Sequence, residues 1–90
     1  MSTENYINHP TFGLLFRLCM VGEKRELFAT LYAQRLFFVV TSSNPKEFIF
    51  ESVGRSDARL LLEERMRDLR RRGDYLEYDR LQKTYKQTFR

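Results

Sequence analysis

The chain has 90 residues, a formal net charge of +4 at pH 7 and one cysteine, Cys19. A chain of this length forms one domain, or one small domain with an appendage. It disfavours a deep substrate pocket, because it buries only about 60–65% of its unfolded surface. The single cysteine excludes an internal disulfide framework and indicates a reducing compartment.

The first residues, MSTENYINHP, lack the basic segment and the apolar run of a signal peptide. The longest apolar run is far shorter than the roughly 20 residues that span a bilayer. We therefore expect a cytoplasmic protein that makes no contact with a membrane.

Charge and aromatic content divide the chain at about residues 53–54. Residues 1–53 are net neutral and hold nine of the thirteen aromatic residues, whereas residues 54–90 carry the whole net charge of +4. This division places a boundary between residues 1–53 and residues 54–90, which the patterns described next assign to a Tudor-like β domain and a two-helix C-terminal extension.

Short alternating segments separated by turn residues predict four or five antiparallel strands in the first part. Residues 12–21 alternate between a mixed face and an apolar face made of Phe12, Leu14, Phe16, Leu18 and Met20. A charged hairpin connection at residues 22–25, a loop at residues 41–46 and a final short strand at residues 48–50 follow. A short edge strand ends at Pro10, which cannot donate to a ladder. The predicted fold is mainly β with α, a small antiparallel Tudor-like (SH3-like) barrel followed by a C-terminal antiparallel helical hairpin.

The stretch at residues 27–40, LFATLYAQRLFFVV, is rich in β-branched and aromatic residues and predicts strand rather than helix. Its fourteen residues exceed the usual length of one strand, so we expect a bend or tight turn at residues 33–35. Tyr32, Gln34 and Arg35 interrupt both alternating faces in the middle of the stretch. The interruption indicates a recognition surface on a small β core, although spacing alone fits an interface and a plain core equally well.

Two helical segments follow, each with its own boundary signals. Ser56 is the expected N-cap of the first, Asp57 lies in its first turn, and Gly73 is the natural residue after its end. Asp74 and Glu77 have the spacing of a capping box at the start of a second helix, which ends near residue 87. Apolar residues recur at helical spacing, at Ala58, Leu61, Leu62, Met66 and Leu69 and again at Tyr78, Leu81, Tyr85 and Phe89. The short connection predicts an antiparallel hairpin.

Catalytic and metal sites are not indicated by the sequence. His9, the only histidine, lacks the partners of a catalytic triad and is expected in a turn or facing solvent. Cys19 lies in a strand pattern and is expected to be a buried structural thiol. One histidine and one cysteine cannot supply the usual zinc ligands, and four scattered glycines form no phosphate loop. We therefore expect a protein that is not an enzyme.

A basic cluster in the first helix leaves two interpretations open. Its members are Arg65, Arg67, Arg70, Arg71 and Arg72. The cluster fits phosphate contact, so a small nucleic-acid-binding barrel with a basic helical tail is the alternative function. The favoured interpretation is a solvated helix face, because acidic residues at helical spacing can neutralise the arginines, namely Glu63, Glu64 and Asp68.

A further alternative is a reader of methylated side chains, which needs an aromatic cage. Phe28, Tyr32 and Phe38 are the aromatic residues of the central stretch that are available to such a cage. Nothing in the sequence requires these three side chains to converge.

Residues 8–15, NHPTFGLL, and residues 31–38, LYAQRLFF, closely resemble the cyanobacterial PipX family, the family of PII-interacting protein X. Shorter matches at residues 54–55, 69–71 and 86–89 extend the resemblance over essentially the whole chain. Members of this family have an N-terminal Tudor-like domain and two C-terminal helices. The resemblance therefore implies the fold that composition and patterning also predict.

The resemblance implies a non-enzymatic adaptor of nitrogen regulation. Such proteins bind the PII signalling protein when 2-oxoglutarate is low, and they bind and co-activate the transcription factor NtcA when 2-oxoglutarate is high. The effectors, 2-oxoglutarate and ATP or ADP, occupy the partners, so the adaptor needs no cofactor. The resemblance also implies that the two helices form a second contact surface, towards NtcA and further transcriptional regulators. Nucleic acid is then contacted only indirectly, through these partners.

The resemblance also implies which residues form one surface shared by both partners. Tyr32 and Arg35 are expected at the centre of PII binding. The whole predicted protein-binding surface comprises Tyr6, Tyr32, Gln34, Arg35, Leu36 and Phe38. Loops at residues 22–25 and 42–47 depart from the family pattern, so no family contact is carried over to them.

Overall fold

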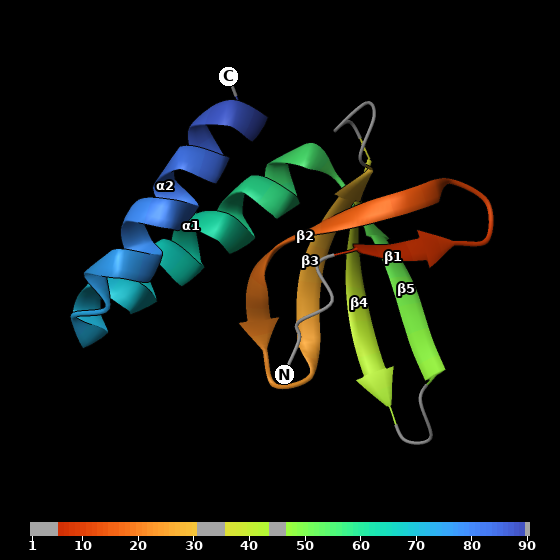
Figure 1. Cartoon of the computed structure of the whole chain (residues 1–90), viewed down its shortest axis with the longest axis horizontal. Coiled ribbons are helices and arrows are strands. Elements are labelled where there is room, and N and C mark those ends of the chain that lie inside the picture. Colours follow the sequence, from red (N-terminus) through yellow and green to blue (C-terminus); the bar gives the residue numbers. More distant parts are fainter. Residues whose placement is uncertain (1–5, 31–35, 44–46, 90) are drawn as a thin grey trace.

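The computed structural model describes residues 6–30, 36–43 and 47–89 of the chain. Figure 1 shows a curled sheet with two helices on one side of it. In chain order the elements are β1 (Tyr6–His9), β2 (Gly13–Gly22), β3 (Arg25–Thr30), β4 (Phe37–Ser43), β5 (Glu47–Val53), α1 (Arg55–Arg72) and α2 (Tyr75–Thr88). Neither helix of the described chain is long and apolar enough to cross a membrane. The architecture confirms the predicted fold class, mainly β with α.

The sheet is a meander in which each strand pairs antiparallel with the next, in the order β1-β2-β3-β4-β5. Two irregularities of register within residues 17–22 bend β2. The sheet curls so far that the rings of His9 in β1 and Phe50 in β5 meet, with centroids 4.7 Å apart. The result is the half-closed barrel expected of a Tudor-like fold.

Both faces of the sheet are buried, which explains why its central strands are apolar on both alternating sets. The residues inside the curl form an inner core of Leu15, Phe28, Phe38 and Val40, with Ile7 and Phe50 at its edge. The outer face and the helices form a larger, helix-facing core of Leu18, Cys19, Leu27, Ala29, Phe37, Val39, Ala58, Leu62, Leu69 and Leu81. Alternate residues of β3 and β4 therefore point to different cores, as the two-residue period of a strand requires.

The stretch at residues 27–40 forms two strands rather than one, as its length suggests. β3 ends at Thr30, β4 begins at Phe37, and the two strands are antiparallel. At this reversal Thr30 N donates to Leu36 O at 3.1 Å. The two alternating sets of the stretch are divided between the two cores. The bend or tight turn expected at residues 33–35 lies outside the described residues.

The apolar face predicted for residues 12–21 is wrong, because it does not stay on one side of the sheet. Leu15, from the predicted mixed face, is fully buried, and the successive residues Leu18 and Cys19 both lie in the helix-facing core. A bulge adds one residue to a strand and shifts the alternation beyond it. Because the bulge depends on pairing with β3, the pattern of β2 alone does not locate it.

The loop predicted at residues 41–46 is too long. β4 continues to Ser43, and Thr41 pairs with Ile49 of β5. The β-branched side chain of Thr41 favours a strand, and this preference outweighs the turn-forming composition that follows it. β5 begins at Glu47 and has seven residues, so it is longer than the short strand predicted at residues 48–50.

Gly54, and not Ser56, is the N-cap of α1. Ala58 N donates to Gly54 O at 2.9 Å, so Ser56 and Asp57 lie within the first turn of the helix. Glycine is a tolerated N-cap residue, so the helix begins two residues earlier than the Ser56 signal predicts. Asp57 keeps its predicted place, where its charge favours the helix dipole.

The link between the helices follows the predicted signals. Gly73 has a φ of 79°, the left-handed conformation that glycine adopts readily, and its N–H donates to Arg70 O at 3.1 Å. Asp74 caps α2, because its side chain accepts a hydrogen bond from Glu77 N at 3.3 Å. With only Gly73 and Asp74 between them, α1 and α2 form an antiparallel hairpin (Figure 1).

Specific contacts hold the end of α2 against the sheet and against α1. The Phe89 ring stacks on Phe37 of β4 with centroids 5.4 Å apart, and the Arg55 guanidinium lies 5.1 Å from the Phe89 centroid. The Tyr85 hydroxyl of α2 donates to a carboxylate oxygen of Glu63 in α1. These contacts tie the end of α2 to the start of α1 and to β4.

Candidate protein-binding site

Half of the predicted protein-binding residues lie in the described part of the chain. The described residues are Tyr6, Leu36 and Phe38, whereas Tyr32, Gln34 and Arg35 lie outside the described residues. Tyr6, at the start of β1, is 52% exposed, and Leu36, which precedes β4, is 41% exposed. Two large apolar side chains of the predicted surface are thus open to solvent.

Tyr6 and Leu36 lie at the same end of the sheet. A row of directly paired residues crosses the sheet from β1 to β4 and consists of Tyr6, Phe16, Ala29 and Phe37. Leu36 directly precedes the last member of this row. β3 ends at Thr30, one residue beyond this row, and β4 begins in the row at Phe37. We call this part of the molecule the β3–β4 end.

Phe38 lies beneath the surface rather than on it. Its side chain is 4% exposed, and its ring centroid lies 4.8 Å from that of His9 and 5.7 Å from that of Phe12. Strand alternation turns the Phe38 ring into the inner core, so it offers little exposed surface of its own. The part of Phe38 in binding stays a prediction, and in this structure its ring packs beneath His9 and Phe12.

The β1–β2 turn displays an aromatic residue that the sequence did not single out. Phe12 is exposed, and His9 Nδ1 accepts hydrogen bonds from Thr11 N at 2.9 Å and from Phe12 N at 3.1 Å. The expectation that His9 serves in a turn is therefore confirmed. Alternation assigned Phe12 to a strand, whereas Gly13, with a φ of 78°, is the signal that the turn extends up to it.

Cys19 is a buried structural thiol, as expected. It is 5% exposed, and burial raises the pKa of the thiol to about 12. The thiol is therefore protonated at neutral pH, and a protonated thiol is a poor nucleophile. The part of the chain that the structure describes contains no group of three His, Cys, Asp or Glu side chains able to hold a metal ion.

The aromatic cage for methylated side chains does not form from the expected residues. Phe28 is 1% exposed and Phe38 is similarly buried, because both fill the inner core. A cage must open to solvent to admit a methylated cation. Two of its three expected walls are closed, so Phe28 and Phe38 do not line such a cage.

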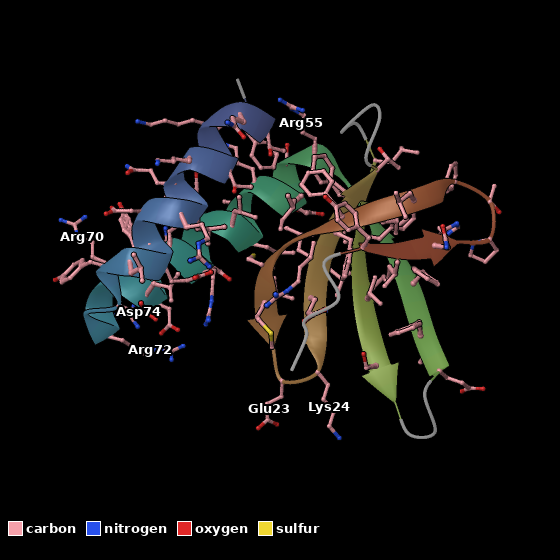
Figure 2. All side chains as sticks on the ribbon, viewed as in Figure 1. Glu23, Lys24, Arg55, Arg70, Arg72 and Asp74 are labelled. Atoms are coloured by element: carbon pink, nitrogen blue, oxygen red, sulfur yellow. The ribbon has the colours of Figure 1, made fainter. Side chains whose placement is uncertain are left out.

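The basic cluster of α1 is partly neutralised by ion pairs within the helix. Asp68 accepts from Arg72 Nη2 at 2.7 Å and from Arg65 Nη1 at 3.4 Å, and the hydrogen bond from Arg72 lowers the pKa of the Asp68 carboxyl. Figure 2 shows Arg70 and Arg72 near Asp74, at the closed end of the hairpin. The opposite end of the hairpin packs on the β3–β4 end of the sheet, so the cluster lies apart from the candidate surface.

Comparison with known proteins agrees with the resemblance found in the sequence. No curated protein matches the chain. The family model described as PipX, PII-interacting protein X, matches residues 3–89, which is nearly the whole chain. The match covers all five strands and both helices. The chain therefore belongs to the PipX family of PII-interacting regulatory proteins.

Proposed function

We propose that this chain is a cytoplasmic, non-enzymatic adaptor of nitrogen regulation with two alternative partners. It binds the PII signalling protein when 2-oxoglutarate is low, and it binds NtcA as a co-activator when 2-oxoglutarate is high. The observation that carries the proposal is membership of the PipX family over residues 3–89, since this family is named for its interaction with PII.

The β3–β4 end is the part of the fold that supports this proposal. Tyr6 and Leu36 are exposed there on a sheet with two packed cores, which is a rigid base for recognition. Tyr32, Gln34 and Arg35 belong to the segment that joins the two strands at this end. Tyrosine and arginine are enriched at interface hot spots, because they combine a large contact area with polar groups.

Competition for this one surface is the proposed switch. A surface occupied by one protein excludes the other, so the partner whose affinity is raised by its effector takes the adaptor. The effectors, 2-oxoglutarate and ATP or ADP, act on PII and NtcA, and the adaptor needs no cofactor. The helices provide a second contact element, towards NtcA and further transcriptional regulators.

A competition experiment with purified proteins tests the proposal. The tagged chain is first loaded with PII in the presence of ADP, and NtcA is then added with or without 2-oxoglutarate and ATP. We expect PII to be retained without 2-oxoglutarate and to be replaced by NtcA with it. Capture that does not respond to the metabolite would contradict the switch, and one chain holding both partners at once would contradict a shared surface.

A further inference from the structure

The two edges of the sheet differ in how they are protected against pairing with another strand. β1 has four residues and is followed directly by Pro10, and short strands next to proline are common devices at sheet edges. β5 has seven residues and keeps a regular register with β4 from Val53 to Glu47. Among the described residues β5 pairs only with β4, so one side of its backbone faces outward.

The first half of β5 also displays apolar side chains. Phe48 is 52% exposed and Ile49 is 56% exposed, and as successive strand residues they project to opposite faces. The next residue, Phe50, is covered by the His9 ring at the end of β1, with centroids 4.7 Å apart. In Figure 1 the start of β5 lies on the side of the sheet away from the helices. Neither β1 nor a helix therefore covers Phe48 and Ile49.

The charge pattern of β5 selects the kind of segment that fits beside it. Glu47, Ile49 and Glu51 alternate along one face, and β5 contains no cation. On β4 the partners of Ile49 and Glu51 are Thr41 and Val39, which are uncharged. The face of β5 that carries Glu47, Ile49 and Glu51 is thus acidic, apolar and acidic in turn. An added strand complements this face when its alternate residues are basic, apolar and basic.

A second copy of this chain fits the same edge poorly. Antiparallel pairing of two β5 strands about Ile49 places Glu47 of each copy opposite Glu51 of the other. Like charges directly opposite each other destabilise a strand pair. The edge therefore favours a partner of opposite charge over self-pairing.

We propose that β5 binds an extended basic segment of another protein by strand addition. Backbone hydrogen bonds to the outward side of β5 supply affinity, while an apolar residue opposite Ile49 flanked by Lys or Arg supplies selectivity. Ile49 pairs with Thr41, four residues along β4 from Phe37, so this edge site lies about 13 Å from the β3–β4 end at the usual rise of a strand. An adaptor occupied at the β3–β4 end thus keeps β5 available to a third protein.

Titration of the full-length, isotope-labelled chain with a short synthetic peptide that contains Lys-Thr-Val-Thr-Lys tests this site, because alternate residues of a strand share one face and Val then lies opposite Ile49 between two lysines. We expect chemical-shift changes and slowed amide exchange along Glu47–Val53, with little change along β1. Two N-methylated versions of the peptide separate strand addition from simple charge attraction. Methylation of the alternate amides that face β5 should abolish binding, whereas methylation of the other alternate amides should preserve it.

Two charge variants complete the test. Glu51→Lys is expected to weaken peptide binding about fivefold or more, because it places like charges across the new strand pair. Glu23→Lys changes the same charge in the exposed β2–β3 turn (Figure 2) and should leave binding unchanged. Equal binding of both methylated peptides, equal binding of the same peptide with Glu in place of both Lys, shifts confined to another surface, or absence of binding would each overturn the proposal.

Discussion

Tyr32 tests the proposed PII surface at the scale of one side chain. We expect Tyr32→Ala to weaken binding to PII by more than ~1 kcal/mol, or about fivefold, as for an aromatic hot-spot residue. Calorimetry with purified PII in the presence of ADP measures this change. Tyr75→Ala is the matched control, because Tyr75 is 60% exposed at the closed end of the helical hairpin, apart from the β3–β4 end. An equal loss in both variants would contradict the assigned surface.

Tyr85 and Glu63 make the contact between the helices depend on pH. The hydrogen bond donated by Tyr85 lowers the pKa of the Glu63 carboxyl below its usual value of about 4.3. The folded chain therefore favours the charged Glu63 carboxylate. The stability that the Tyr85–Glu63 hydrogen bond contributes is complete above the usual pKa of a glutamate and is lost as the pH falls through the lowered pKa of Glu63 in the folded chain. We expect Tyr85→Phe to unfold at a lower urea concentration than the parent chain at about pH 7, and the difference to shrink at about pH 3.

Tyr75→Phe is the control for this pH dependence, since it removes an exposed hydroxyl from the same helix. It should leave the urea midpoint unchanged at either pH. A Tyr85→Phe difference of the same size at both pH values would show that the hydrogen bond from Arg59 Nε to the Tyr85 hydroxyl at 2.8 Å, and not the Glu63 carboxylate, explains the destabilisation.

The candidate surface could be predicted only in part, because alternation in a two-sided sheet does not say which side is open. Leu36 and Phe38 occupy equivalent positions in the alternating pattern, yet Leu36 is exposed and Phe38 fills the inner core. Leu36 lies just outside β4, where the sheet no longer covers it, and Phe38 lies inside the strand. The curl of the whole sheet decides this difference, and a local pattern does not contain it.

At the scale of single elements, the helices were more predictable than the strands. Gly73 and Asp74 are local signals, since one supplies a left-handed conformation and the other caps the next helix within three residues. The bulges of β2 and the length of β4 depend on pairing with neighbouring strands. Long-range pairing therefore explains these errors in the strands, whereas the N-cap of α1 lies only two residues before the predicted Ser56.

The end of α1 depends on glycine at position 73. Gly73→Ala is expected to cost about 1–2 kcal/mol, because an L side chain is strained in the left-handed region. A Cβ there would meet no atom within 4 Å, so the cost arises from the backbone alone. Gly22→Ala is the control, because the φ of Gly22 is not positive and its Cβ would make ordinary contact with Arg25. Urea denaturation should show a change within about 0.5 kcal/mol for the control, and equal losses would contradict this account.

At the scale of the whole molecule, the change of composition at residues 53–54 separates two kinds of element but not two cores. This change of composition lies next to the start of α1 at Arg55. The helix-facing core joins Leu27 and Val39 of the sheet to Leu62 of α1 and Leu81 of α2. A sheet stripped of its helices would expose this apolar face, so we expect the sheet and the helices to unfold together.

Leu62→Ala tests this cooperativity, because Leu62 is fully buried between α1 and the sheet. The substitution is expected to cost about 2–5 kcal/mol through lost burial and a residual cavity. Leu60→Ala removes the same atoms two residues earlier, where the side chain is 55% exposed, and should change stability by no more than about 0.5 kcal/mol. Thermal unfolding followed by far-UV helix signal and by backbone NMR signals of β3 and β4 should shift together in the Leu62 variant. A helix transition that moves alone would show that the sheet stands without the helices, and the division at residues 53–54 would then be a boundary between independent domains.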